Sequence, residues 1–256
     1  MKRLLLLTFI AALTASAQPT DLFLLIGQSN MAGRGVVEPR DQVSIPNVYT
    51  FNKDKAWAPA IDPLHFDKPN LPGVGIGRSF ASFLIAQKAA TSIGLIPAAF
   101  GGSALEEWTP GSPHYANAVA RAKAALAGAG KGARLRGILW HQGEADSKLE
   151  ARATTYRTRF AAMIEQLRKD LNAEEVPVIV GQLGEFFATD SYAKTVNEQL
   201  ATIPLTVHLS GFVSSQGLKH KGDDVHFDAP ALRELGRRYA LAWLALTPTA
   251  SQSARP

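Results

Sequence analysis

Four short segments of the sequence carry side chains that could together hydrolyse an ester. They are Gly-Gln-Ser-Asn-Met at 27–31, Gly-Gly-Ser at 101–103, Trp-His-Gln-Gly-Glu-Ala-Asp at 140–146 and Asp-Asp-Val-His-Phe at 223–227. A serine hydroxyl needs a neighbouring base to act as a nucleophile, and a histidine can serve when a carboxylate orients its imidazole. Ser29, His226 and Asp223 supply these three groups. The negative oxygen of a tetrahedral intermediate needs fixed donors, which glycine N–H groups and a glutamine amide can provide.

Each of these residues also has an ordinary structural interpretation when it is considered alone. Ser29 could be a turn serine, and His141 beside Trp140 fits a packing role as well as a catalytic one. A metal-dependent hydrolase is a further alternative, and its acidic and histidine ligands would be Glu144, His141, Asp223, Asp224 and His226. No spacing among them matches a recognised metal motif, so we expect no metal and no other cofactor.

The elements that must position these segments alternate between short apolar runs and longer helical patterns. The apolar runs predict strands at 22–26, 93–100, 135–140, 176–180 and 205–209. Helical spacing predicts helices at 74–90, 114–127, 151–171, 192–200 and 229–246. This alternation favours an α/β fold in which helices cover both faces of a parallel, mainly five-stranded sheet. Ligands bind beyond the carboxyl ends of strands in such sheets, and we expect all four segments to lie in loops at this edge.

The two ends of the chain are predicted to lie outside this fold. Lys2 and Arg3 precede an apolar run at 4–13, and Ala-Ser-Ala follows at 15–17, which is typical of a signal peptide cleaved after Ala17. A membrane anchor is the alternative, but the run is shorter than the roughly 20 residues that span a bilayer. We expect export to the periplasm or the medium, with no membrane attachment after cleavage.

The rest of the sequence is predicted to form a single domain at 18–249, followed by a frayed tail at 250–256. A loop-rich insertion at 33–73 carries six prolines and shows no sign of a separate domain. The chain contains no cysteine, which excludes a thiol nucleophile and a thiolate zinc site. The net charge is +5 and falls to +3 when the two cations of the signal segment are removed. Its basic residues are scattered, so we expect no nucleic-acid partner.

Taken together, the four segments resemble the motif blocks of the SGNH hydrolase superfamily. More narrowly, they resemble its sialate O-acetylesterase-like branch, which includes the acetyl xylan esterases of carbohydrate esterase family 6. The resemblance runs from 21 to about 246 and implies a three-layer α/β/α sandwich with a flavodoxin-like sheet. It implies that Ser29 is the nucleophile and His226 the general base. The oxyanion hole would comprise the N–H groups of Ser29 and Gly102 and the side-chain amide of Gln142, where the wider superfamily has asparagine.

The resemblance leaves the acid of the triad open between two carboxylates. Asp223 lies three residues before His226, a spacing that a turn can close, and we favour it. Glu144 is the alternative, because the glutamate of the third block has also been considered for this role in the branch.

The implied reaction removes O-acetyl groups from a carbohydrate, such as acetyl xylan or a related glycan, through an acyl-enzyme. A sialate O-acetylesterase, a short-chain lipase or thioesterase, and a non-catalytic carbohydrate-binding protein are the alternatives. Aromatic side chains in the loops, such as Trp57, Phe66 and Trp108, could form a platform for a sugar. The sequence makes no prediction of the oligomeric state.

Overall fold

Strand β1 (Asp21–Gly27) lies at the centre of the sheet, and all of its residues are buried. The computed structural model describes residues 18–187 and 191–247, and within them seven strands follow the order β3-β2-β4-β1-β5-β6-β7. The other strands are β2 (Val48–Phe51), β3 (Trp57–Pro59), β4 (Ile93–Pro97), β5 (Arg134–His141), β6 (Val178–Gly181) and β7 (Ser210–Val213). Neighbouring strands are parallel except for β2 and β3, which are antiparallel. The carboxyl ends of the parallel strands therefore share one edge.

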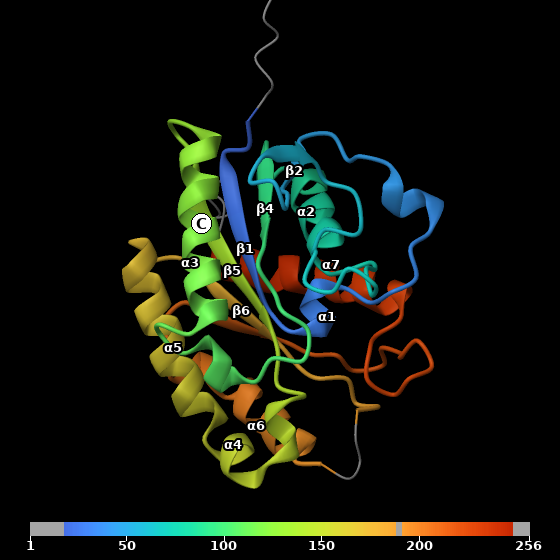
Figure 1. Ribbon diagram of the computed structural model, residues 1–256, viewed down its shortest axis with the longest axis vertical. Helices are drawn as coiled ribbons and strands as arrows, with labels where there is room; N and C mark the ends of the chain where they lie inside the picture. Colours follow the sequence, from blue (N-terminus) through green and yellow to red (C-terminus); the bar gives the residue numbers. More distant parts are fainter. Residues whose placement is uncertain (1–17, 188–190, 248–256) are drawn as a thin grey trace, which may run out of the picture.

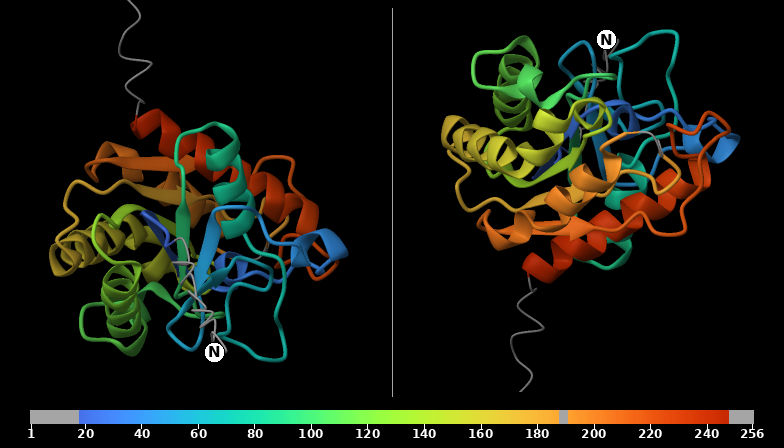
Figure 2. Two further views of the ribbon diagram at one scale, coloured as in Figure 1. Left: turned by 90° about the horizontal axis from the view of Figure 1, so that it is seen from above. Right: turned by 90° about the horizontal axis from the view of Figure 1, so that it is seen from below.

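Helices cover both faces of this sheet (Figure 1, Figure 2). Helices α2 (Gly77–Ala86) and α7 (Ala229–Leu246) pack on one face, and α3 (Pro113–Ala129) and α5 (Tyr156–Leu171) pack on the other. The shorter helices are α1 (Ser29–Ala32), α4 (Glu150–Thr154) and α6 (Ala193–Ala201), and 3₁₀ turns lie at Pro39–Gln42, Leu105–Trp108, Asp146–Lys148 and Ile203–Leu205. The predicted three-layer α/β/α fold is confirmed.

Successive side chains of β1 enter two different hydrophobic cores, because side chains alternate between the two faces of a strand. Leu22, Leu24 and Ile26 join the core beneath α3 and α5. Phe23 and Leu25 join the core beneath α2 and α7. Each of these side chains is fully buried, which is worth about 1.5–3 kcal/mol per side chain. Packing on both faces fixes the position of β1, and with it the turn that follows.

The sheet is wider than the five strands that the apolar runs predicted. Strands β2 and β3 lie in the insertion at 33–73, where the sequence indicated only loops. Val48 and Phe51 are buried, but β2 has only four residues and gives too short a run to be recognised. The predicted helix at 151–171 is also divided, because Thr155 separates α4 from α5.

The strand predicted at 205–209 is wrong. Ile203–Leu205 form a 3₁₀ turn with Pro204 inside it, and Leu205 is 79% exposed. The last strand is β7, which begins at Ser210 and pairs with β6 through Val178. The strand therefore forms where the chain pairs with β6, and not at the apolar run of 205–209.

The predicted signal peptide at 1–17 and the tail at 250–256 lie outside the described residues. Among the helices of residues 18–187 and 191–247, none combines the length and the apolar character that a bilayer crossing requires.

Candidate active site

The turn after β1 presents Ser29 at the carboxyl edge of the sheet. Gly27 ends the strand with φ +128°, and a Cβ atom there would lie 2.2 Å from the His141 carbonyl oxygen. Only glycine fits such a close approach between β1 and β5. The Gln28 N–H donates to the same oxygen at 2.9 Å, and α1 begins at Ser29. The serine is thus held where two strand ends meet.

His226 and Asp223 form a chain of contacts with Ser29. The His226 Nε2 atom lies 3.0 Å from Ser29 Oγ, and its Nδ1 atom lies 2.7 Å from Asp223 Oδ2. Asp223 Oδ1 accepts the backbone N–H groups of His226, at 2.8 Å, and Val225, at 3.1 Å. Desolvation raises the pKa of the Asp223 carboxyl, but its hydrogen bonds outweigh this and hold the pKa well below its usual value. An ionised carboxylate faces Nδ1, so Nε2 is free to accept a proton from Ser29.

The loop that carries His226 is anchored by its neighbours. Phe227 is fully buried, and Asp228 accepts the Ala231 N–H at 2.7 Å as the N-cap of α7. Such a cap is worth about 1 kcal/mol to a helix. The Lys221 N–H donates to the His226 carbonyl oxygen at 2.9 Å. These contacts fasten the loop of His226 to the start of α7.

A pocket of about 320 Å³ opens beside these residues and is lined by residues from all four sequence segments, with the second segment contributing only its two glycines. Its lining comprises Gln28, Ser29, Arg34, Lys68, Leu71, Gly101, Gly102, Glu144, Ala145, Lys148, Phe187, Val225 and His226. Gly102 has φ +84°, and its N–H makes no hydrogen bond within the part of the chain that the structure describes. Both backbone groups that the resemblance implied as oxyanion donors, those of Ser29 and Gly102, thus border one pocket.

The Gln142 side chain does not lie where an oxyanion donor was predicted. It is fully buried and does not line this pocket. Its Nε2 atom donates to Asp146 Oδ2 at 2.7 Å and to the Ser103 carbonyl oxygen at 3.0 Å. Its Oε1 atom accepts the Tyr156 hydroxyl at 2.8 Å. A buried carboxylate is a stronger acceptor than a neutral group, so Asp146 draws the amide inward. Both amide hydrogens are engaged, and none remains for an oxyanion.

Gln28 brings a different side-chain amide to the pocket. Its Oε1 atom accepts a hydrogen bond from the Ala145 N–H at 3.3 Å and a longer one from Gln142 Nε2 at 3.4 Å. Its own Nε2 atom has no hydrogen-bond partner among the described residues, and the residue borders the pocket directly before Ser29. The sequence analysis missed Gln28, although its place in the first segment was a usable signal.

Glu144 does not contact His226, so only one of the two candidate acids touches the imidazole. Its Oε1 atom accepts the Asn30 amide at 2.6 Å, and its buried Oε2 atom has no partner among the described residues. Burial raises the pKa of Glu144 to about 7, although the hydrogen bond from Asn30 opposes this shift. The geometry therefore favours Asp223 as the orienting carboxylate.

An ion pair between Arg34 and Asp67, which the sequence analysis missed, supports the turn at Gly101 and Gly102. Arg34 Nη2 lies 2.6 Å from Asp67 Oδ2, and both side chains are 4% exposed. The same Asp67 oxygen accepts the Gly101 N–H at 2.8 Å. Asp67 therefore fixes the peptide next to Gly102. Its place in the Pro-containing insertion, 34 positions before Gly101, gave no signal of this contact.

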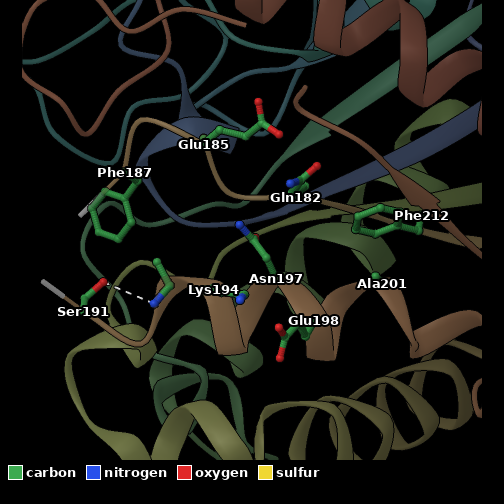
Figure 3. A pocket seen from close by; sticks show the side chains of 11 residues that line it. Gln182, Glu185, Phe187, Ser191, Lys194, Asn197, Glu198, Ala201 and Phe212 are labelled. Carbon is green, nitrogen blue, oxygen red and sulfur yellow. Dashed lines mark hydrogen bonds between the residues drawn. The ribbon is translucent and has the colours of Figure 1, made fainter. Parts of the chain in front are cut away.

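The aromatic side chains predicted as a sugar platform do not line the pocket. Trp108 is buried, the Trp57 indole donates to the Ala125 carbonyl oxygen, and the Phe66 ring lies against a guanidinium group. Phe187 borders the pocket instead. Phe187 also borders a larger hollow, of about 560 Å³, between the end of β6 and α6. Figure 3 shows the side chains that line it.

His141 packs in the interior, away from the pocket. Its Nδ1 atom lies 3.0 Å from the Tyr239 hydroxyl, and burial lowers its pKa to about 3. The sequence had left its role open, and this environment fits packing. Across residues 18–187 and 191–247, no three or more histidine and acidic side chains come together as metal ligands would.

Comparisons with known proteins identify the family and the fold. The model of the family described as "Carbohydrate esterase, sialic acid-specific acetylesterase" matches residues 19–245. A probable carbohydrate esterase of Arabidopsis thaliana, At4g34215, is 32% identical over 244 residues, which cover 88% of this chain and 91% of the relative. Its crystal structure superposes with a TM-score of 0.80 and 31% identity over 89% of this chain and 98% of that chain.

A more distant solved structure shares the fold alone. The crystal structure of NanS superposes with a TM-score of 0.73 at 19% identity and covers 90% of this chain and 98% of that chain. The overall fold is therefore shared although most residues differ between the two chains.

Proposed function

The chain belongs to the sialic acid-specific acetylesterase family of carbohydrate esterases, and from this premise we propose that it removes O-acetyl groups from glycans by serine catalysis. Membership of this family makes the protein a carboxylic ester hydrolase. One observation carries the mechanism: His226 Nε2 lies 3.0 Å from Ser29 Oγ while Asp223 holds the opposite nitrogen of the ring. This is the arrangement that activates a serine.

The reaction proceeds in two steps. Ser29 Oγ attacks the acetyl carbonyl carbon as His226 accepts its proton, and the protonated imidazole then gives that proton to the departing sugar oxygen. Water, deprotonated by His226, releases acetate from the acyl-enzyme in the second step. Asp223 keeps the imidazole in the tautomer with the proton on Nδ1.

The oxyanion of each tetrahedral intermediate is bound by donors that border the pocket. These are the N–H groups of Ser29 and Gly102 and, in the place first assigned to Gln142, the Nε2 group of Gln28. Such donors act strongly because they are already oriented before charge develops.

The preferred substrate is an acetylated plant-type polysaccharide such as acetyl xylan, which fits the export expected from the pattern at 1–17. An O-acetylated sialic acid is the second candidate, and one observation favours it. Lys68 and Lys148 border the pocket, and neither forms an ion pair within the described residues. Two such cations suit the carboxylate of an acidic sugar.

The test measures acetate release by the purified protein from an aryl acetate, acetyl xylan, acetylated mannan and O-acetyl sialic acid. Wild type is expected to hydrolyse the aryl acetate and one glycan, and Ser29→Ala is expected to reduce activity by at least a thousandfold with an unchanged far-UV spectrum. Unreduced activity in this variant would overturn the serine mechanism. Glycan binding without turnover by the wild type would favour a binding protein, and faster cleavage of long acyl esters would favour a lipase or thioesterase.

A further inference from the structure

Asn30, the neighbour of the nucleophile, makes hydrogen bonds on both sides of the general base. The residue is fully buried and does not border the pocket. Its Oδ1 atom accepts the Phe227 N–H at 3.1 Å, and its Nδ2 atom donates to the Val225 carbonyl oxygen at 3.1 Å. These two groups belong to the residues that flank His226. One side chain from the nucleophile turn therefore holds the backbone on either side of the base.

These contacts are the main polar link between the two segments that must meet for catalysis. Within the described residues, the hydrogen bonds between 27–35 and 218–228 are the two made by Asn30 and the contact of His226 with Ser29. The other hydrogen bonds of 218–228 are made within this loop, such as that of His226 N–H to Asp223, or to the residues just before and after it in the chain. They fix the shape of the loop but not its distance from Ser29.

The Asn30 amide can hold both groups in only one of its two orientations. A rotated amide would place Nδ2 against the Phe227 N–H and Oδ1 against the Val225 carbonyl oxygen, so that donors face donors and acceptors face acceptors. Glu144 selects the working orientation, because its Oε1 atom accepts the Nδ2 group at 2.6 Å and can accept nothing from an oxygen in that place.

We propose that Asn30 is a positioning residue that clamps the backbone around His226 onto the nucleophile turn, and that Glu144 acts through Asn30 by fixing the direction of its amide. The inference rests on the proposed esterase function for its kinetic consequences but not for its structural ones. It also gives the third sequence segment a role other than that of the triad acid. Asn30 does not border the pocket, and the role proposed for Glu144 is exerted through Asn30.

The first experiment compares kcat and KM for an aryl acetate in wild type, Asn30→Ala, Glu144→Gln and the double variant. Asn30→Ala is expected to lower kcat about 100-fold with KM changed less than threefold, because a displacement of about 1 Å costs that much at a reacting centre. Glu144→Gln keeps an acceptor oxygen for Asn30 and is expected to lower kcat less than fivefold. The double variant is expected to match Asn30→Ala, since Glu144 has nothing left to orient.

Asn197→Ala is the matched control. Asn197 also uses its amide to hold a loop, with Oδ1 accepting the Leu183 N–H at 2.9 Å, but it lies outside the catalytic pocket. It is expected to lower the Tm as Asn30→Ala does while keeping kcat within twofold. Equal kcat losses in the two variants would show general destabilisation and overturn the proposal. So would additive losses in the Asn30 and Glu144 double variant, or a loss for Glu144→Gln as large as for Asp223→Asn.

A crystal structure of Asn30→Ala tests the clamp without any assay. We expect the distance between His226 Nε2 and Ser29 Oγ to exceed 3.5 Å in the variant. A distance unchanged from 3.0 Å would overturn the proposal. If wild type hydrolyses no ester, the proposed function fails, and the displacement of His226 still decides whether Asn30 positions it.

Discussion

The Nε2 atom of His226 lies 3.0 Å from the Oγ atom of Ser29, although 197 positions of sequence separate the two residues. The contact joins the first strand of the sheet to the start of its last helix. Because these elements approach at the carboxyl edge of the sheet, the base is delivered to the nucleophile by the topology of the fold. The following predictions test which neighbouring groups this contact depends on.

Asp223→Asn is expected to lower kcat by about 10³–10⁴-fold, because an amide at this place favours the wrong imidazole tautomer. Asp224→Asn is the matched control, since Asp224 is exposed and faces His220 at 3.2 Å. It is expected to keep kcat within threefold. Steady-state kinetics with an aryl acetate decide this, and a small effect of Asp223→Asn would reopen the assignment of the acid.

Gln28→Ala is expected to lower kcat by about 10²–10³-fold with little change in stability, as the loss of one oxyanion donor does. Gln142→Ala is expected to act mainly on stability. It removes one hydrogen bond each from Asp146 and Tyr156, which keep their contacts with Arg159 and Trp140, at about 1–3 kcal/mol in total. Kinetics and urea unfolding of both variants separate the roles. The opposite pattern would restore Gln142 as the donor.

Asp67→Ala is expected to destabilise the protein by about 3–5 kcal/mol, because it leaves the Arg34 charge buried and uncompensated. The Gly101 N–H also loses its acceptor, so kcat should fall in the fraction that remains folded. Asp54→Asn breaks an exposed pair with Lys53 and should cost less than about 1 kcal/mol. Thermal and urea unfolding measure both. Similar costs for the two variants would contradict the importance of the buried pair.

Glu144→Gln is expected to change how stability depends on pH. Burial raises the pKa of Glu144 from 4.5 to about 7, so between these values the folded protein keeps a proton that the unfolded chain releases. The free energy of unfolding of the wild type therefore falls, relative to the variant, by about 3 kcal/mol as the pH rises from 4.5 to above 7. Urea unfolding of both proteins at pH 4.5 and 8 measures this difference. A constant difference would show that Glu144 has an ordinary pKa when folded.

The sequence was sufficient to predict that the residues of the candidate site lie together, because they follow strand ends. Apolar runs locate the strands, and parallel pairing then brings Ser29, Gly102 and the segment at 140–146 to one edge without further information. The pair Asp223 and His226 could be predicted because three residues of spacing allow a turn to close it. In these cases local pattern and global fold agree.

What could not be predicted is the direction of a side chain whose partner is distant in sequence. Gln28 and Gln142 carry the same amide, and only the buried carboxylate of Asp146 decides which one turns inward. Asp67 reaches Gly101 through an insertion whose path has no periodic signal. Tertiary contacts decide these positions, and one sequence does not display them.

The place of β1 in the sheet has a consequence for the order in which the protein becomes active. Strand β1 is synthesised first, but its neighbours β4 and β5 follow much later, and the base comes only with the residues that start α7. A nascent chain shorter than 226 residues thus carries the nucleophile without its base. Hydrolysis of an aryl acetate is therefore expected only from chains that extend beyond the segment 223–227.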